Sequence, residues 1–140
     1  MNTQTTIKNK IQELVNATEG QIKTVIFDDL SQVNAKSKTE YPLLLLKPTN
    51  MEAKDRSLEY FSGDIDLFLF TPELVKDEKH WTEKWDELEK ILVPLLRSWL
   101  ADVPTYVLES TVKVSCGHFQ HNAALIGIRA QFKLRLFYGC

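Results

Sequence analysis

The sequence predicts a two-layer α+β domain in which helices cover one face of a mostly antiparallel sheet. In two segments, 3–17 and 76–102, apolar residues recur at 3- and 4-residue spacing, which is typical of amphipathic helices. Segments with alternating or continuous apolar residues, typical of strands, lie between and after them. The 140 residues, 44% hydrophobic and 26% charged, suit a single globular domain over residues 1–140.

The first half of the chain predicts one helix and three strands. The helix over 3–17 has an apolar stripe made of Ile7, Ile11, Leu14 and Val15. The segment 23–29 (KTVIFDD) is rich in β-branched residues and predicts a short strand. The segment 41–48 (YPLLLLKP), bracketed by prolines, predicts a second strand, and 57–71 predicts a third. The connections between these strands are polar.

The segment 76–102 is the strongest helix signal in the chain. Its apolar stripe consists of Trp81, Trp85, Leu88, Leu92, Leu95, Leu96 and Trp99, and we interpret the tryptophans as core anchors. Pro94 lacks the N–H that would bond to residue 90, so we expect a kink or a break there. Because the stripe continues past Pro94, a long kinked helix or two helices in line are both consistent with it.

The C-terminal third predicts a β-hairpin, which completes the element order α-β-β-β-α-β-β. Even-numbered positions are apolar in both 106–114 and 124–138, and the segment 117–122 (GHFQHN) supplies the turn. Centring the turn there places Cys116 opposite residues 124–126, so that even positions face even positions. In this register Cys140 lies too far away for a disulfide with Cys116.

The second face of the sheet is less polar than a solvated face should be. In the third strand, Ile65, Leu67 and Leu69 form one apolar face, whereas the opposite face begins with Asp64 and Asp66 and ends with aromatic residues. Scattered apolar surface residues or coverage by the N-terminal helix would account for this. Alternatively, another copy of the chain covers them. The candidate interface residues are Phe68, Phe70, Leu125 and Phe137.

Polar and charged residues give little support for an enzyme. Cys116, His118 and His121 offer zinc-ligand atom types, but turn histidines and a buried cysteine are the simpler interpretation, so we expect no metal or other cofactor. We interpret Asp64 and Asp66 as solvated carboxylates. The net charge of −2 argues against general nucleic-acid binding. For the basic stripe we favour cross-strand or inter-subunit salt bridges over DNA contact; it consists of Arg129, Lys133 and Arg135.

The succession of segments resembles a known family. It comprises YPLLLLKP, then LEYFSGDIDLFLFTP, then a tryptophan-rich helix with an internal ILVP, then a long two-strand ending. This succession is similar to the tail terminator (tail completion, head–tail joining) proteins of long-tailed bacteriophages. The resemblance spans residues 3–138 and rests on the order of elements and a few proline positions.

The resemblance implies a structural role in the virion. Such proteins form a ring, expected to be a hexamer, that caps the tail tube and helps to join tail to head. The implied partners are further copies of the chain, the tube protein and a head-completion or connector protein, with passive passage of DNA and no membrane. The implied location is the virion tail, and the host cytoplasm during assembly. Arg129, Lys133 and Arg135 would line the ring or pair between subunits.

Two other functions are consistent with the sequence. One is a small non-viral adaptor whose open sheet binds a protein segment. The other is a metal-binding protein that uses the turn with Cys116, His118 and His121.

Overall fold

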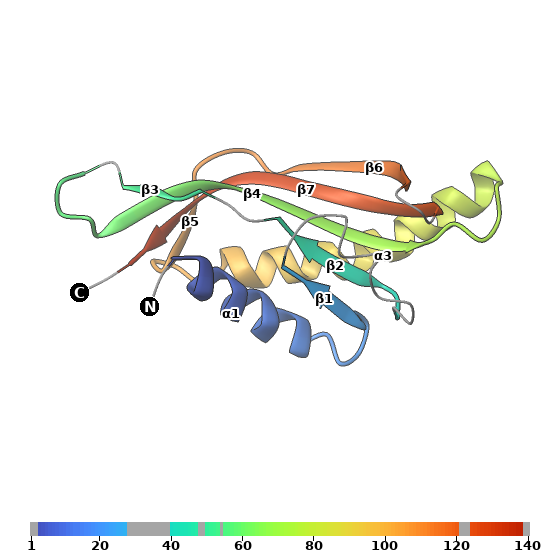
Figure 1. Ribbon diagram of the computed structural model, residues 1–140, viewed down its shortest axis with the longest axis horizontal. Helices are drawn as coiled ribbons and strands as arrows, with labels where there is room; N and C mark the ends of the chain where they lie inside the picture. Colours follow the sequence, from blue (N-terminus) through green and yellow to red (C-terminus); the bar gives the residue numbers. More distant parts are fainter. Residues whose placement is uncertain (1–2, 28–39, 48–49, 54, 121–123, 139–140) are drawn as a thin grey trace.

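The computed structural model describes residues 3–27, 40–47, 50–53, 55–120 and 124–138. These residues form an α+β fold, in which two helices lie on one face of a seven-stranded sheet (Figure 1). The elements are α1 (Thr3–Asn16), β1 (Thr24–Ile26), β2 (Leu43–Leu46), β3 (Glu52–Ala53), β4 (Tyr60–Pro72), α3 (Glu78–Leu100), β5 (Tyr106–Leu108), β6 (Lys113–Gln120) and β7 (Ala124–Phe137). The predicted fold class is confirmed.

The sheet is antiparallel except at one edge. Its order is β1-β2-β4-β7-β5, with β3 beside β4 and β6 beside β7, and only β1 and β2 pair in parallel among the described strands. All four residues of β2 are buried, because Leu44 and Leu46 face the helices while Leu43 and Leu45 face the opposite side. Burial on both faces explains why this strand is a continuous apolar run rather than an alternating one.

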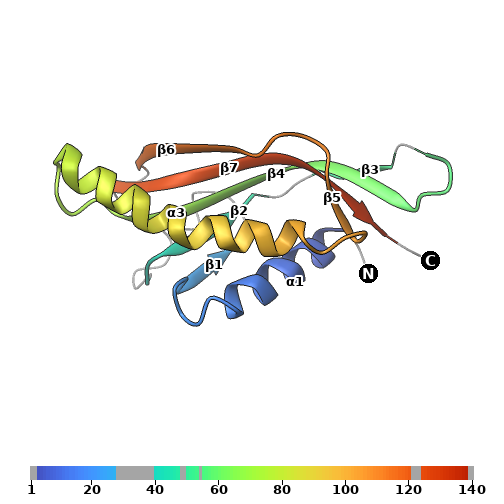
Figure 2. The ribbon, with the colours of Figure 1, turned by 180° about the vertical axis from the view of Figure 1, so that it is seen from behind.

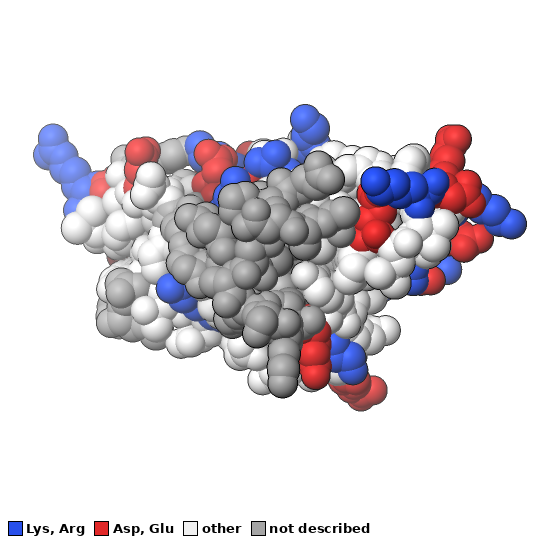
Figure 3. Space-filling view, turned by 45° about the vertical axis from the view of Figure 1, so that its right-hand side comes forward, with Lys and Arg blue, Asp and Glu red and all other residues white. Residues whose placement is uncertain are grey.

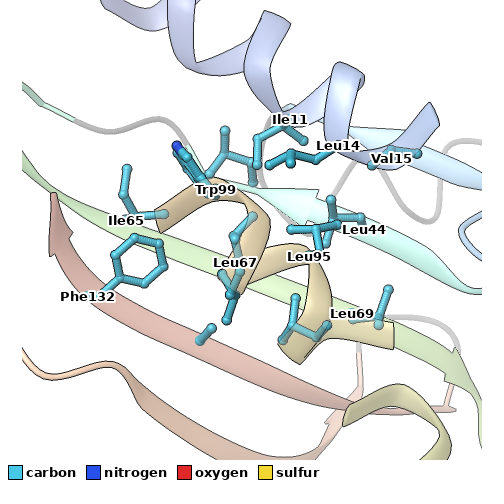
Figure 4. Close-up of a cluster of buried hydrophobic side chains, with 14 of the residues drawn as sticks. Ile11, Leu14, Val15, Leu44, Ile65, Leu67, Leu69, Leu95, Trp99 and Phe132 are labelled. Carbon is cyan, nitrogen blue, oxygen red and sulfur yellow. The ribbon is translucent and has the colours of Figure 1, made fainter. Parts of the chain in front are cut away.

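Both helices pack on the same side of the sheet (Figure 2). The predicted stripe of α1 is buried, and side chains of α1 and α3 point toward one another above β2 and β4 (Figure 4). Trp99 is fully buried and makes edge contacts with Tyr106 and Phe132, at ring-centroid distances of 5.8 and 5.6 Å. The expectation that the N-terminal helix covers the second face is therefore wrong, because α1 adds to the core on the first.

The helix α3 runs without a break through Pro94. The side chain of Pro94 is exposed, so the backbone group that loses its partner lies on the solvent side of the helix. Of the two alternatives, a long kinked helix and two helices in line, the chain forms a single helix without a break. In the part of the chain described here, neither helix has the length and apolar character needed to cross a membrane.

The C-terminal β-structure has three strands where two were predicted. Both β5 and β6 pair with β7, but four residues (109–112) separate them, while only two (132–133) separate their partners on β7. The Ser110 hydroxyl accepts the backbone N–H of Lys133 at 2.7 Å, and the Glu109 N–H donates to the Lys133 carbonyl at 2.8 Å. These bonds satisfy the polar groups of β7 at the interruption.

The predicted pairing of even residues with even residues in the C-terminal strands is confirmed, but the predicted position of the turn is wrong. Even residues face even residues throughout, yet Cys116 lies opposite Ile128 rather than residues 124–126. Residues 117–120 belong to β6 instead of the turn. The segment 49–56, predicted as a connection, contains the short strand β3. Residues 28–29 of the predicted first strand lie outside the described residues.

Candidate functional site

The second face of the sheet carries its own apolar cluster at one end. Six of its side chains are buried, namely Ile26, Leu43, Leu45, Phe68, Phe70 and Leu125, with Tyr41 and Phe119 packed against them. Phe68 and Phe70 stack with their ring centroids 5.4 Å apart. Phe119, from β6, meets both rings edge-on, at 5.5 and 5.0 Å. The aromatic residues of two strands therefore cover one another within one chain.

Two facing glycines make room for these rings. Gly127 on β7 lies opposite both Phe70 on β4 and Gly117 on β6. An added Cβ on Gly127 would stand 2.5 Å from the backbone oxygen of Leu69 and 2.7 Å from Cδ1 of Phe70. An added Cβ on Gly117 would meet the Phe119 ring at 3.2 Å. The glycines thus leave space for the rings of Phe70 and Phe119 on this part of the sheet.

The predicted exposure of three interface candidates is wrong. Phe68, Phe70 and Leu125 have exposed fractions of 2%, 0% and 3%. Their coverage comes from within the protomer, so it gives no physical reason to place another copy over them. The fourth candidate, Phe137, is 37% exposed and stays a candidate for an interface.

Charged residues occupy the middle of the second face, next to the apolar cluster. Two of them form an ion pair. The Arg129 guanidinium donates Nε to Oδ1 and Nη2 to Oδ2 of Asp66, at 2.8 and 2.7 Å. The same guanidinium lies 5.0 Å from the ring centroid of Phe68, and Lys47 Nζ lies 5.3 Å from it. Both cations thus cover the outer side of Phe68. The hydrogen bond to Asp66 raises the pKa of Arg129. Arg129 thus makes a cross-strand salt bridge, one of the alternatives left open by the sequence, and its role in a ring stays a prediction.

The other two residues of the basic stripe lie opposite polar residues of β4. Lys133 is the register partner of Asp64, and Arg135 is the register partner of Ser62, whose hydroxyl donates to Glu109 Oε1. The Arg135 guanidinium lies 4.9 Å from the ring centroid of Tyr60. The face seen in Figure 3 likewise mixes both signs of charge rather than gathering one. Roles of Lys133 and Arg135 in a ring stay predictions.

The structure puts Cys116 and His118 on the side of β6 that faces α3. His118 Nδ1 lies 2.8 Å from Oε2 of Glu73, and its ring makes edge contacts with Trp81 and Trp85. Partial desolvation beside α3 raises the pKa of the Cys116 thiol, with nearby carboxylates adding to it, which favours the neutral form. His121 and Cys140 lie outside the described residues. Within the described chain, no three potential metal ligands come together.

An exposed aromatic surface lies at one end of the molecule. The start of β4 and the end of β7 project beyond both helices (Figures 1 and 2). We call this surface the aromatic tip; it consists of Leu58, Tyr60, Phe61, Phe137 and Tyr138. Tyr60 packs on Phe137 and Phe61 on Tyr138, with ring centroids 5.2 and 5.3 Å apart. Leu58 and Tyr138 are 57% and 46% exposed, so a single chain leaves much of the tip in water.

A second apolar surface lies between α3 and the edge strand β6. Among the described strands, β6 pairs only with β7, so its other edge has no partner strand; the Gly117 carbonyl accepts Trp85 Nε1 at 3.4 Å. Beside that edge is a groove of about 470 Å³, which we call the α3–β6 groove; it is lined by Val93, Leu96, Arg97, Leu100, Ala101, Val112 and Val114. Its lining is apolar except for Arg97. The groove therefore suits an apolar side chain accompanied by a carboxylate.

Sequence reasoning missed the groove, and of the tip it found only Phe137. A signal for the groove was present, since the segment ILVPLLRSWL is apolar on more of its circumference than one stripe requires. The tip had a weaker signal, because Phe137 and Tyr138 end an alternating strand in two consecutive aromatic residues. Its position beyond the helices depends on how far β4 and β7 run past α1 and α3.

No protein-family model matches the chain, and no curated protein sequence matches it either.

Proposed function

We propose that the chain is a structural protein of a phage or prophage virion, a tail terminator. In this role, copies of the chain form a ring, expected to be a hexamer, that caps the tail tube and helps to join tail to head. The protein works by binding and self-assembly and not as an enzyme. It acts in the virion tail after assembly in the host cytoplasm, and its partners are the tube protein and a head-completion or connector protein.

The observation that carries the proposal is the order of the elements and the positions of the prolines that bound or interrupt them. An aliphatic strand follows Tyr41 and Pro42, a long alternating strand ends at Pro72, and a tryptophan-rich helix runs through Pro94 before the final β-structure. The two-layer α+β fold agrees with this order. Fold alone does not fix function, so the proposal depends on an assembly experiment.

The aromatic tip and the α3–β6 groove support self-assembly in particular. A closed ring needs two different surfaces on each copy, because each copy contacts its two neighbours through different patches. The tip and the groove are two separate, exposed, largely apolar surfaces of one chain. The support no longer comes from Phe68 and Phe70, which are buried.

The test is direct observation of rings. The purified chain is examined by size-exclusion chromatography with light scattering and by negative-stain electron microscopy, alone and after mixing with tail tubes. We expect closed rings, or caps at one end of the tubes. A strictly monomeric chain that also fails to bind tubes at high concentration would refute the proposal. Tube and head genes beside the coding sequence would support it independently.

A second candidate function is an adaptor that binds an extended segment of another protein. The unpaired edge of β6 favours it, because an added strand would gain backbone hydrogen bonds while its side chains reach the groove. A chain that stays monomeric, binds no tubes and captures an extended peptide along β6 would favour this function over the first.

A further inference from the structure

The conformation of Leu58 suggests that the aromatic tip is built to make a contact. Leu58 adopts a left-handed backbone with φ of 57°, which is costly for a bulky residue that is not glycine. The Asp55 carboxylate holds the turn by accepting the Leu58 N–H at 3.1 Å and the Ser57 hydroxyl at 2.9 Å. The result is a leucine that is 57% exposed, two residues before Tyr60 of the Tyr60–Phe137 pair. Strain that presents an apolar side chain to water points to a binding role.

The tip and the groove are complementary in shape and polarity. The tip projects from the sheet, whereas the groove is a hollow of about 470 Å³, a size that accepts one or two aromatic side chains. None of the tip residues lines the groove of its own chain. Filling the groove therefore requires the tip of another copy or a different molecule.

The charges beside these surfaces favour another copy. Glu59 lies next to the tip, since its carbonyl accepts the Tyr138 N–H at 2.7 Å, and its side chain is exposed. Arg97 is the one charged residue that lines the groove, and it is also exposed. Among the described residues, neither Glu59 nor Arg97 has an ion-pair partner within the chain. The tip also carries the Arg135 guanidinium, 4.9 Å from the Tyr60 ring centroid. The match therefore rests on the exposed Glu59 carboxylate and the exposed Arg97 guanidinium.

We propose that the aromatic tip of one copy occupies the α3–β6 groove of the next, with Glu59 facing Arg97. The contact joins two different patches, so it is heterologous, and it gives a closed ring when the rotation between successive copies closes. The inference rests on the proposed function, in which copies of the chain assemble, and it specifies which surfaces they use. Phe137 is at the centre of the contact, and the open edge of β6 lies at its rim.

Charge reversal tests the pairing without disturbing the core. Glu59→Arg and Arg97→Glu are each expected to weaken association of the full chain by about tenfold or more, because each places like charges together. The double variant restores opposite charges and is expected to recover most of the affinity. Association is measured by analytical ultracentrifugation, and ring formation by negative-stain electron microscopy. Circular dichroism checks that each variant is folded.

Matched controls reverse charges elsewhere on the surface. Glu83→Arg and Lys76→Glu alter exposed residues that line neither surface and have no ion-pair partner in the described chain. We expect both controls to associate like the unmodified chain. An apolar test, Tyr138→Ser, is expected to weaken association as well, since it removes part of the tip that enters the groove.

The outcomes separate this inference from the proposed function. Rings that form equally well with either single reversal would overturn the tip-in-groove contact and leave the proposed function standing. Weakening by both single variants without recovery in the double variant would also overturn the pairing. An unmodified chain that assembles neither with itself nor with tubes would overturn both proposals. Binding of a peptide along the groove of a monomeric chain would assign the groove to a different protein.

Discussion

Replacing Gly127 by alanine tests how tightly β7 is held against β4. The added Cβ would stand 2.5 Å from the Leu69 backbone oxygen and 2.7 Å from Cδ1 of Phe70. Both distances are shorter than real Cβ contacts, so something must shift. The Phe70 ring can turn only at the expense of its packing on Phe68 and Phe119, and the Leu69 oxygen belongs to the longest ladder of the sheet.

The magnitude follows from which atoms have to move. Overpacking of a core costs about 1–3 kcal/mol. Because one of the two close atoms belongs to paired backbone, we expect Gly127→Ala to lose about 2–3 kcal/mol of unfolding free energy. Unfolding entropy is about 2.1 cal/mol/K per residue, so over 140 residues this loss lowers Tm by about 7–10 °C.

The matched control is Gly117→Ala on the neighbouring strand. Its Cβ would meet only the Phe119 ring, at 3.2 Å, and a half-buried ring can move aside. We expect a loss below about 1 kcal/mol for this variant. Thermal and urea unfolding followed by circular dichroism measure both. If Gly127→Ala is as stable as the unmodified chain, or if the two variants lose equal stability, β7 does not approach β4 as described.

Three further predictions concern single side chains. Burial raises the pKa of Tyr106 from 10.0 to about 12, so the unfolded chain loses this proton first as pH rises. Stability should then fall by up to about 2–3 kcal/mol between pH 10 and 12 and not below that range, and Tyr106→Phe should remove this part of the fall in urea titrations. Asp66→Asn should cost about 1 kcal/mol by breaking the paired hydrogen bonds from Arg129, with a smaller loss in high salt; a loss that ignores salt would contradict the ion pair. Phe119→Ala should lose about 1–3 kcal/mol and increase binding of a hydrophobic dye, because it uncovers Phe70; unchanged dye binding would show that the ring is covered by other residues.

The side-chain patterns predicted which face each strand residue would take. Alternation in β4 and β7 placed Ile65, Leu67 and Leu69 toward the helices, and the structure has them in the main core. The apolar stripe predicted for the first helix is likewise buried in α1. These features follow from the fixed periods of helix and strand, which a single sequence reveals without reference to distant residues.

What the sequence could not reveal depends on contacts between distant segments. Gly117 and His118 read as turn residues, because glycine and polar residues usually mark turns. In the fold, Gly117 is instead a strand residue next to the Phe119 ring. The His118 ring contacts the carboxylate of Glu73, the residue that follows the last residue of β4. The split between β5 and β6 was hidden in the same way, since a side-chain hydroxyl of Ser110 takes over part of the ladder.

The interface prediction failed for a related reason. The alternation of side chains along the strand correctly placed Phe68 and Phe70 on the second face. It gives no information about which other residues lie on that face. Two cationic side chains lie over Phe68, and one ring from β6 packs against both phenylalanines; none of these is near them in sequence. An apolar residue on a predicted outer face is thus poor grounds for an interface unless its neighbours across the sheet are known.

The long pairing of β4 with β7 has a mechanical consequence. The ladder runs from Tyr60 opposite Phe137 to Pro72 opposite Leu125, and its hydrogen bonds lie across the strand direction. A pull along the strands loads all of these bonds together, whereas a peeling force would break them one at a time. The ladder therefore resists a pull along its strands more strongly than a force that peels one end, and one continuous set of hydrogen bonds joins the aromatic tip to the end near Glu73 and His118.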